Sequence, residues 1–161
     1  MSAYIQKLIL QGEHQRQDFK FQVNDSRKIA RTLVAFANTE GGKLLIGVKD
    51  NGVIAGIRTD EEYHMIEAAA GMYCKPEIDF ASRHWNIEGK KLLEVDVPRA
   101  QVKPCYALSE ENKWLAYIRV ADQNILASTI MIKYWSRKNS SRGAMIRYTD
   151  KEKLLLEYLS A

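Results

Sequence analysis

The segment Asp18-Phe19-Lys20 carries an acid and a base two residues apart. Successive side chains of a strand point to opposite faces, so Asp18 and Lys20 would lie on the same face. In a phosphodiesterase, such a carboxylate can bind a metal ion while the lysine stabilises charge that develops on the phosphate. The acid could equally form a surface ion pair with Lys20 or Arg119, and both interpretations stay open.

Three basic residues, Arg27, Lys28 and Arg31, stand at the start of a predicted helix. A helix N-terminus flanked by cations is a good phosphate site, although a solvated polar face has the same pattern. Arg119 interrupts an apolar strand, where it could bind phosphate or pair with an acid. Four aromatic residues near the basic C-terminal segment could stack on unpaired bases or belong to the core: Trp114, Tyr117, Tyr134 and Trp135.

The net charge of +4 arises in one C-terminal segment. No acidic residue occurs between Asp122 and Asp150, whereas five of the 24 basic residues lie there: Lys133, Arg137, Lys138, Arg142 and Arg147. The rest of the chain, with 19 basic and 20 acidic residues, is close to neutral. Because Lys and Arg gain affinity for a polyanion by releasing counterions, this segment favours contact with nucleic acid. A solvated surface is the alternative.

The composition indicates one folded domain. The 161 residues, 46% hydrophobic and 27% charged, exclude a disordered chain, a collagen-like fibre and a mucin-like stalk. No apolar run, including residues 44–48, is long enough to span a membrane, and the N-terminus lacks a secretory pattern. We therefore expect a cytoplasmic protein without membrane contact. The two cysteines form no CxxC motif and the three histidines lack metal spacing, so zinc is not expected.

Periodicity and turn residues predict an α+β single domain with a mixed, mostly antiparallel sheet flanked by helices. We expect helices over residues 3–11, 27–38, 60–73, 127–135 and 150–159, and strands over 16–23, 44–48, 53–57, 78–87, 91–97, around Tyr106 and over 114–120. Phe19, Phe21 and Val23 should share the buried face of the first strand. Asp50-Asn51-Gly52 favours a tight hairpin.

Two further segments have specific expectations. The leucine-rich last helix is amphipathic, so it either packs back on the domain or mediates a homodimer. Gly41-Gly42-Lys43 does not match the phosphate-binding loop GxxxxGK[ST], and it follows a helix, whose C-terminal dipole repels phosphate. We therefore expect no ATP site there, and interpret the glycines as a helix cap and a tight entry to the next strand.

Several motifs, in order along residues 13–135, resemble the Schlafen AlbA-type domain. They are Glu13-x4-Asp18-Phe19-Lys20, Ala35-Phe36-Ala37-Asn38-Thr39-Glu40-Gly41-Gly42, Leu45-Ile46-Gly47-Val48-Lys49-Asp50-Asn51-Gly52-x3-Gly56, Lys103-Pro104-x-Tyr106 and Tyr117-Ile118-Arg119-Val120. The resemblance implies a Schlafen AlbA-like domain over residues 1–135. A basic linker over 136–148 and the C-terminal helix, 149–161, would follow it.

The resemblance also implies functions. The family is often labelled a DNA-binding domain, and sometimes a divergent ATP-binding one; bacterial members are often named transcriptional regulators. In animal Schlafen proteins, three acidic residues form a metal-dependent endoribonuclease site for transfer and ribosomal RNA. By motif position these acids are Glu13, Asp18 and Asp50, although Asp18 stands where glutamate is usual. Glu13 and Asp18 can converge only if the chain bends between them, as a helix end near Gly12 would permit.

We therefore expect a nucleic-acid-binding domain, a bacterial transcriptional regulator or part of one, that contacts phosphates and needs no cofactor. The expected binding residues are Lys20, Arg27, Lys28, Arg31, Arg119, Lys133, Arg137 and Lys138. One alternative is an endoribonuclease in which Glu13, Asp18 and Asp50 hold Mg²⁺ or Mn²⁺ and Lys20 assists. A second alternative is a protein-interaction module that uses the last helix.

Overall fold

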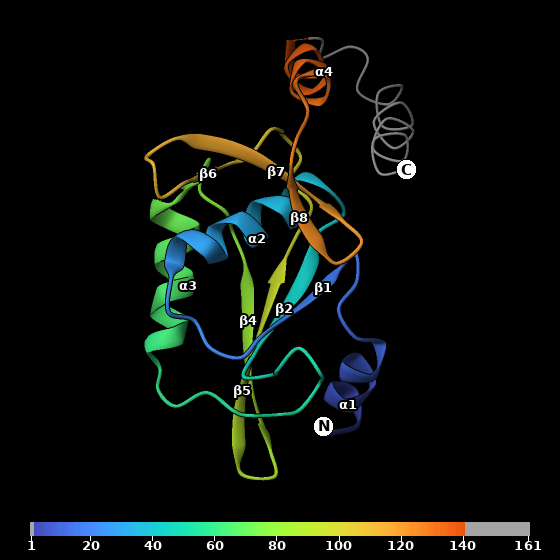
Figure 1. The fold of residues 1–161 in the computed structure, drawn as a ribbon, viewed down its shortest axis with the longest axis vertical. Helices are drawn as coiled ribbons and strands as arrows, with labels where there is room; N and C mark the ends of the chain where they lie inside the picture. The colour runs from blue at the N-terminus through green and yellow to red at the C-terminus, as the bar shows by residue number, and fades with distance from the viewer. Residues whose placement is uncertain (1, 141–161) are drawn as a thin grey trace.

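Helix α2 lies between two four-stranded sheets in the computed structural model, which describes residues 2–140 (Figure 1). The helices are α1 (Ser2–Gln11), α2 (Ser26–Asn38), α3 (Glu61–Met72) and α4 (Thr129–Ser140). The strands are β1 (Gln17–Lys20), β2 (Gly42–Ile46), β3 (Cys74–Lys75), β4 (Ala81–Ile87), β5 (Lys90–Val97), β6 (Tyr106–Leu108), β7 (Trp114–Val120) and β8 (Gln123–Leu126).

The strand order confirms the predicted class, a mixed and mostly antiparallel α+β fold. The first sheet has the order β1-β2-β5-β4, in which only the β1–β2 pair is parallel. The second has the order β3-β6-β7-β8 and is antiparallel throughout. We expected one sheet, whereas the strands form two, because hydrophobic alternation within a strand does not specify which strand it pairs with.

Apolar side chains pack on both faces of the first sheet. On one face, Leu33 and Phe36 of α2 belong to the same buried cluster as Leu44 and Ile46 of β2. On the other face, Ile5 of α1 joins a smaller buried cluster with residues of β1, β2 and β5. The N-terminus of α2 is capped by the side chain of Asp25, which accepts a hydrogen bond from Arg27 N at 3.0 Å.

The Gly41-Gly42 pair allows α2 and β2 to meet closely. Gly41 adopts a φ of +76° and donates its N–H to Phe36 O at 2.7 Å, which ends the helix. A Cβ at Gly42 would come within 2.5 Å of the buried Phe36 ring. The following Lys43 pairs with Glu94 and Asp96. The structure therefore gives both glycines a packing role, as the sequence predicted.

Four local predictions were wrong. Residues 53–57 form no strand, because the Gly47 carbonyl accepts both Ala55 N and Gly56 N and only one isolated bridge remains. Strand β1 stops at Lys20, so Phe21 leaves the predicted buried face and is 45% exposed. The short strands β3 and β8 were not expected. Helix α4 continues to Ser140, past the expected end at residue 135.

Some predictions concern residues outside the described range. These are the helix over 150–159, its homodimer role, Arg142 and Arg147. Within residues 2–140, the structure contains no helix with the length and apolarity needed to cross a bilayer.

We expect Gly42→Ala to destabilise the protein by about 1–3 kcal/mol, because the new methyl group would displace the packed Phe36 ring. Gly71 in α3 is a matched control: a Cβ there would meet only Glu77, at 3.6 Å. Gly71→Ala should stabilise the protein by about 0.5 kcal/mol through helix propensity. Urea unfolding measures both changes, and equal stability of Gly42→Ala and the unchanged protein would contradict the close packing.

Candidate functional site

A tight turn after α1 brings Glu13 back to β1. Gly12 adopts a φ of +69°, and His14 and Gln17 exchange backbone hydrogen bonds of 2.9 and 3.2 Å. The chain thus reverses, and Glu13 Oε1 accepts a hydrogen bond from Phe19 N at 3.1 Å. The bend that the convergence of Glu13 and Asp18 required is therefore present.

The charges of Asp18 and Asp50, the other two predicted acids, act on Glu13. Burial raises the pKa of Glu13, and the charges of Asp18 and Asp50 raise it further, against the hydrogen bond from Phe19 N. Asp50 is exposed in the turn that follows β2, and Gly52 of that turn lies against Ile9 of α1. Near the end of α1, the negative charges of Asp18 and Asp50 therefore oppose the ionisation of Glu13.

Asp18 is buried and paired with two cations. Its Oδ1 lies 3.3 Å from Arg119 Nη2, and its Oδ2 lies 3.3 Å from Lys20 Nζ. Oδ2 nevertheless accepts no well-oriented hydrogen bond. Among residues 2–140, no three His, Cys, Asp or Glu side chains are grouped closely enough to hold a metal ion.

Arg119 is an internal residue rather than a phosphate-binding one. Its side chain is 1% exposed, and its guanidinium donates to the His14 and Gln17 carbonyls, at 3.1 and 3.0 Å from Nη2. Nη1 donates to Asn124 Oδ1 at 3.0 Å, and the group stacks over the Phe36 ring. Arg119 was predicted as a nucleic-acid contact, and in the structure protein groups accept its hydrogen bonds. The alternative of pairing with an acid is the one found.

The basic cluster at the start of α2 is largely engaged by the protein. Arg27 donates to Ser109 O at 2.9 Å and stacks on Tyr73, and Arg31 pairs with Glu110 at 3.0 Å. The Asp25 carboxylate already occupies the anion position at the helix N-terminus. Lys28 is exposed, and it is the member of this cluster best placed to meet a phosphate.

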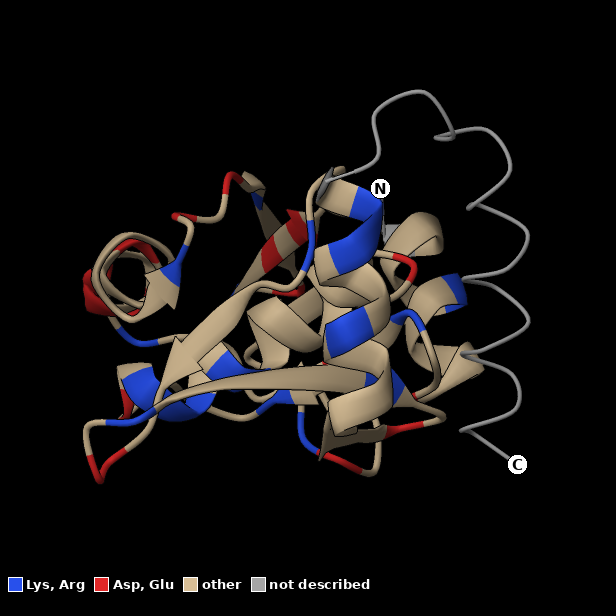
Figure 2. Cartoon of the chain, turned by 90° about the horizontal axis from the view of Figure 1, so that it is seen from above, with Lys and Arg blue, Asp and Glu red and all other residues tan. Residues whose placement is uncertain are grey.

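Helix α4 separates its apolar and basic side chains. Met131 and Trp135 are fully buried, whereas Lys133 and Arg137 are exposed; Lys138 is half-buried. Figure 2 shows Lys and Arg along this helix and no Asp or Glu on it. Of the four aromatic residues considered for base stacking, Trp135 belongs to the core, Tyr117 and Tyr134 are half-buried, and Trp114 is 40% exposed beside Lys75.

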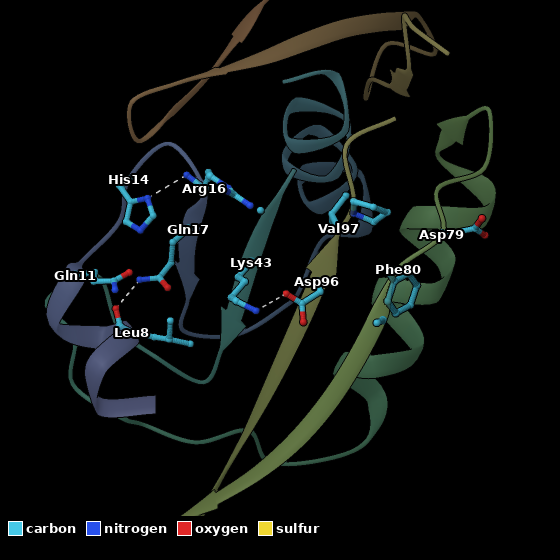
Figure 3. Close-up of a pocket in the computed structure, with 13 residues that line it drawn as sticks. Leu8, Gln11, His14, Arg16, Gln17, Lys43, Asp79, Phe80, Asp96 and Val97 are labelled. Carbon is cyan, nitrogen blue, oxygen red and sulfur yellow. Dashed lines mark hydrogen bonds and ion pairs between the residues drawn. The ribbon is translucent and has the colours of Figure 1, made fainter. Parts of the chain in front are cut away.

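Sequence reasoning missed a pocket of about 620 Å³ beside α1 (Figure 3). Lys43 of β2 and Asp96 of β5 are neighbours in its lining and point toward one another, with Nζ and Oδ1 2.6 Å apart. Buried Glu94 accepts hydrogen bonds from Tyr4 Oη, Lys43 Nζ and Trp85 Nε1. Burial alone would raise the pKa of Glu94, but these three donors favour the carboxylate and lower its pKa. In the sequence, this site could have been found from the alternation of Glu94 and Asp96 with apolar residues in β5.

These features define an α+β domain with a cluster of acids at the end of α1 and a basic helix α4. Residues 13–128 match the family model described as Schlafen, AlbA_2. The match spans well over half of the chain, and the chain belongs to this family. No curated protein is significantly similar to the sequence.

Two solved structures share the fold. The N-terminal domain of a RecG-related protein from Nitrosomonas europaea is 24% identical with a TM-score of 0.54, and the alignment covers 78% of this chain and 87% of that domain. The DIP2311 protein from Corynebacterium diphtheriae is 21% identical with a TM-score of 0.51. That alignment covers 77% of this chain and 24% of the Corynebacterium chain, so this chain corresponds to about a quarter of that protein.

Removing the Arg119 guanidinium should destabilise the protein strongly. Arg119→Leu leaves the Asp18 carboxylate buried without its partner, and we expect a loss of about 3–5 kcal/mol. The double variant Arg119→Leu/Asp18→Leu removes the orphaned charge and should recover part of the loss. Lys28→Gln, on an exposed residue, should change the unfolding free energy by less than about 0.5 kcal/mol. A small effect of Arg119→Leu in urea unfolding would contradict the structural role.

Glu13→Gln should make the protein more stable at pH 7. Because the pKa of Glu13 is raised in the folded state, ionisation favours unfolding, and the amide mimics the protonated form. The difference should disappear below the ordinary pKa of glutamate, about 4.3. Glu94→Gln is the control with the opposite sign, since the folded state favours ionised Glu94. Urea unfolding at pH 7 and below about pH 4.3 tests this. Lower stability of Glu13→Gln at pH 7 would contradict the raised pKa of Glu13.

Proposed function

We propose that this chain binds nucleic acid through phosphate contacts and serves in the cytoplasm as part of a bacterial transcriptional regulator. The observation that carries the proposal is the disposition of α4. Met131 and Trp135 hold the helix on the domain, and Lys133 and Arg137 project to solvent four residues apart, on one face. A fixed pair of cations on an acid-free helix is suited to two neighbouring phosphates.

Family and charge support the same proposal. The Schlafen AlbA_2 family is associated with nucleic-acid binding or with ATPase-like domains. Exposed Lys28 of α2 adds a third cation to the two on α4. Buried cations that pair with protein groups, such as Arg119, contribute nothing to binding. Recognition that depends on phosphates is largely indifferent to base sequence and weakens as salt is added.

The test is fluorescence anisotropy of the full chain with labelled duplex DNA over a range of salt concentrations. Lys133→Gln/Arg137→Gln should weaken binding and reduce the slope of log K against log salt by about 2, since each phosphate contact contributes about 0.9. Lys7→Gln/Lys113→Gln removes the same charge from exposed sites elsewhere and should leave the slope unchanged. Equal behaviour of the two double variants would overturn the role of α4.

Metal-dependent RNA cleavage is the second candidate. It is favoured by the effect that the charges of Asp18 and Asp50 have on the pKa of Glu13. Transfer RNA incubated with Mn²⁺ or with chelator distinguishes the two on a denaturing gel. The exposed Asp50→Asn is the better probe, because Asp18→Asn also disturbs the pair with Arg119. Fragments that need Mn²⁺ and disappear in Asp50→Asn would establish cleavage, whereas intact RNA in every lane would leave binding alone.

A further inference from the structure

A second basic surface lies at the end of β1, apart from the pocket of Figure 3. It is a groove of about 360 Å³ formed by Phe21, Lys49, residues 53–58 and Lys90 at the start of β5. Its volume lies within the range of small-ligand sites. Three of its lining residues are basic, none is acidic, and it shares no residue with the larger pocket.

The three cations of this groove, Lys49, Arg58 and Lys90, are all exposed. Within the described part of the chain, none of them forms an ion pair with a carboxylate; Lys90 Nζ instead donates to Ile54 O at 3.2 Å. This differs from Lys43 and Arg119, whose charges are met by nearby acids. The groove therefore concentrates positive charge that the protein itself does not neutralise, which favours an anionic ligand.

Phe21 gives the groove an exposed aromatic surface. The ring is 45% exposed, whereas Phe19, two residues earlier, is 1% exposed in the core. Lys49 Nζ lies 5.5 Å from the centre of the Phe21 ring. An aromatic ring beside a cation can stack on an unpaired base while the ammonium group meets its phosphate.

One residue of the groove, Gly56, offers only main chain. Gly56 lines it with no side chain and a φ of +83°, and a Cβ there would come within 3.2 Å of Lys90 Cβ. A larger residue at this position would therefore both strain the backbone and narrow the groove. The absence of a side chain lets a ligand approach the backbone closely between Phe21 and the cations.

We propose that this groove binds a single strand of nucleic acid, with phosphates on Lys49, Arg58 and Lys90 and one unpaired base stacked on Phe21. A duplex would not suit it, because paired bases present no free face to a side chain. The inference rests on the proposed nucleic-acid binding but assigns it a second surface. In Figure 1, α4 lies at one end of the long axis and the 49–58 segment toward the other.

The groove adjoins the acids at the end of α1. Phe21 follows Lys20 in the chain, and Lys49 precedes Asp50. Two residues of the groove are therefore direct chain neighbours of residues predicted for the acidic site. A strand held in the groove would pass beside Asp50, and the three cations would offset the repulsion between this acid and the phosphates.

The test compares oligothymidylate, oligouridylate, duplex DNA and an abasic phosphodiester chain by fluorescence anisotropy with the full protein. Lys49→Gln/Arg58→Gln/Lys90→Gln should reduce the salt slope for single strands by about 2, since each contact contributes about 0.7. Phe21→Leu should weaken oligothymidylate binding about tenfold and leave the abasic chain unaffected, because only the base stacks. Oligouridylate shows whether the groove accepts RNA as well as DNA in the same manner.

The control variant Lys7→Gln/Arg83→Gln/Lys113→Gln loses the same charge at exposed positions outside the groove, and thermal melting confirms that each variant is folded. If the unchanged protein binds single strands and the groove variant weakens this binding no more than the control variant does, the groove proposal is overturned. The proposed function would then still stand. Equal effects of Phe21→Leu on the base-containing and abasic chains overturn the stacking contact. No binding of any nucleic acid by the unchanged protein overturns both proposals.

Discussion

The buried guanidinium of Arg119 joins the two sheets. It projects from β7 of the second sheet to the turn before β1 and to Asp18 in the first sheet, and it stacks on Phe36 of α2 between them. Desolvation of such a cation is costly unless every donor finds a partner, and here carbonyls, a carboxylate and an amide provide them. The position of β1, and with it that of the acids, depends on this contact.

This use of Arg119 divides the charged residues into two groups. Asp18 is buried and pairs with Arg119. Glu13 and Asp50 lie closer to solvent, and the charge of Asp50 acts on Glu13. Among the cations, Lys43, Arg31 and Arg119 pair with carboxylates, whereas the side chains of Lys133, Arg137, Lys49, Arg58 and Lys90 are exposed. Exposure, which spacing along the sequence does not reveal, decides which charges can meet a ligand.

The sequence predicted local features better than contacts between distant segments. Helix α2 and strand β5 were expected almost at their observed bounds, because each has strong periodicity and clear end residues. The two-sheet division was not predictable, since it depends on pairing between remote strands. The exposure of Phe21 escaped prediction for a related reason: β1 follows its parallel partner β2 only as far as Ile46, and no periodicity encodes that limit.

Main-chain hydrogen bonds close the base of the segment between Gly47 and Ile57. Gly47 O receives two N–H groups, and Ile57 N donates to Lys91 O at 2.8 Å. None of these bonds depends on the side chains at residues 49–54. Residues 49–54 can therefore change in length and composition during evolution while the sheet keeps its register. This makes the loop a place where relatives can differ in what they recognise.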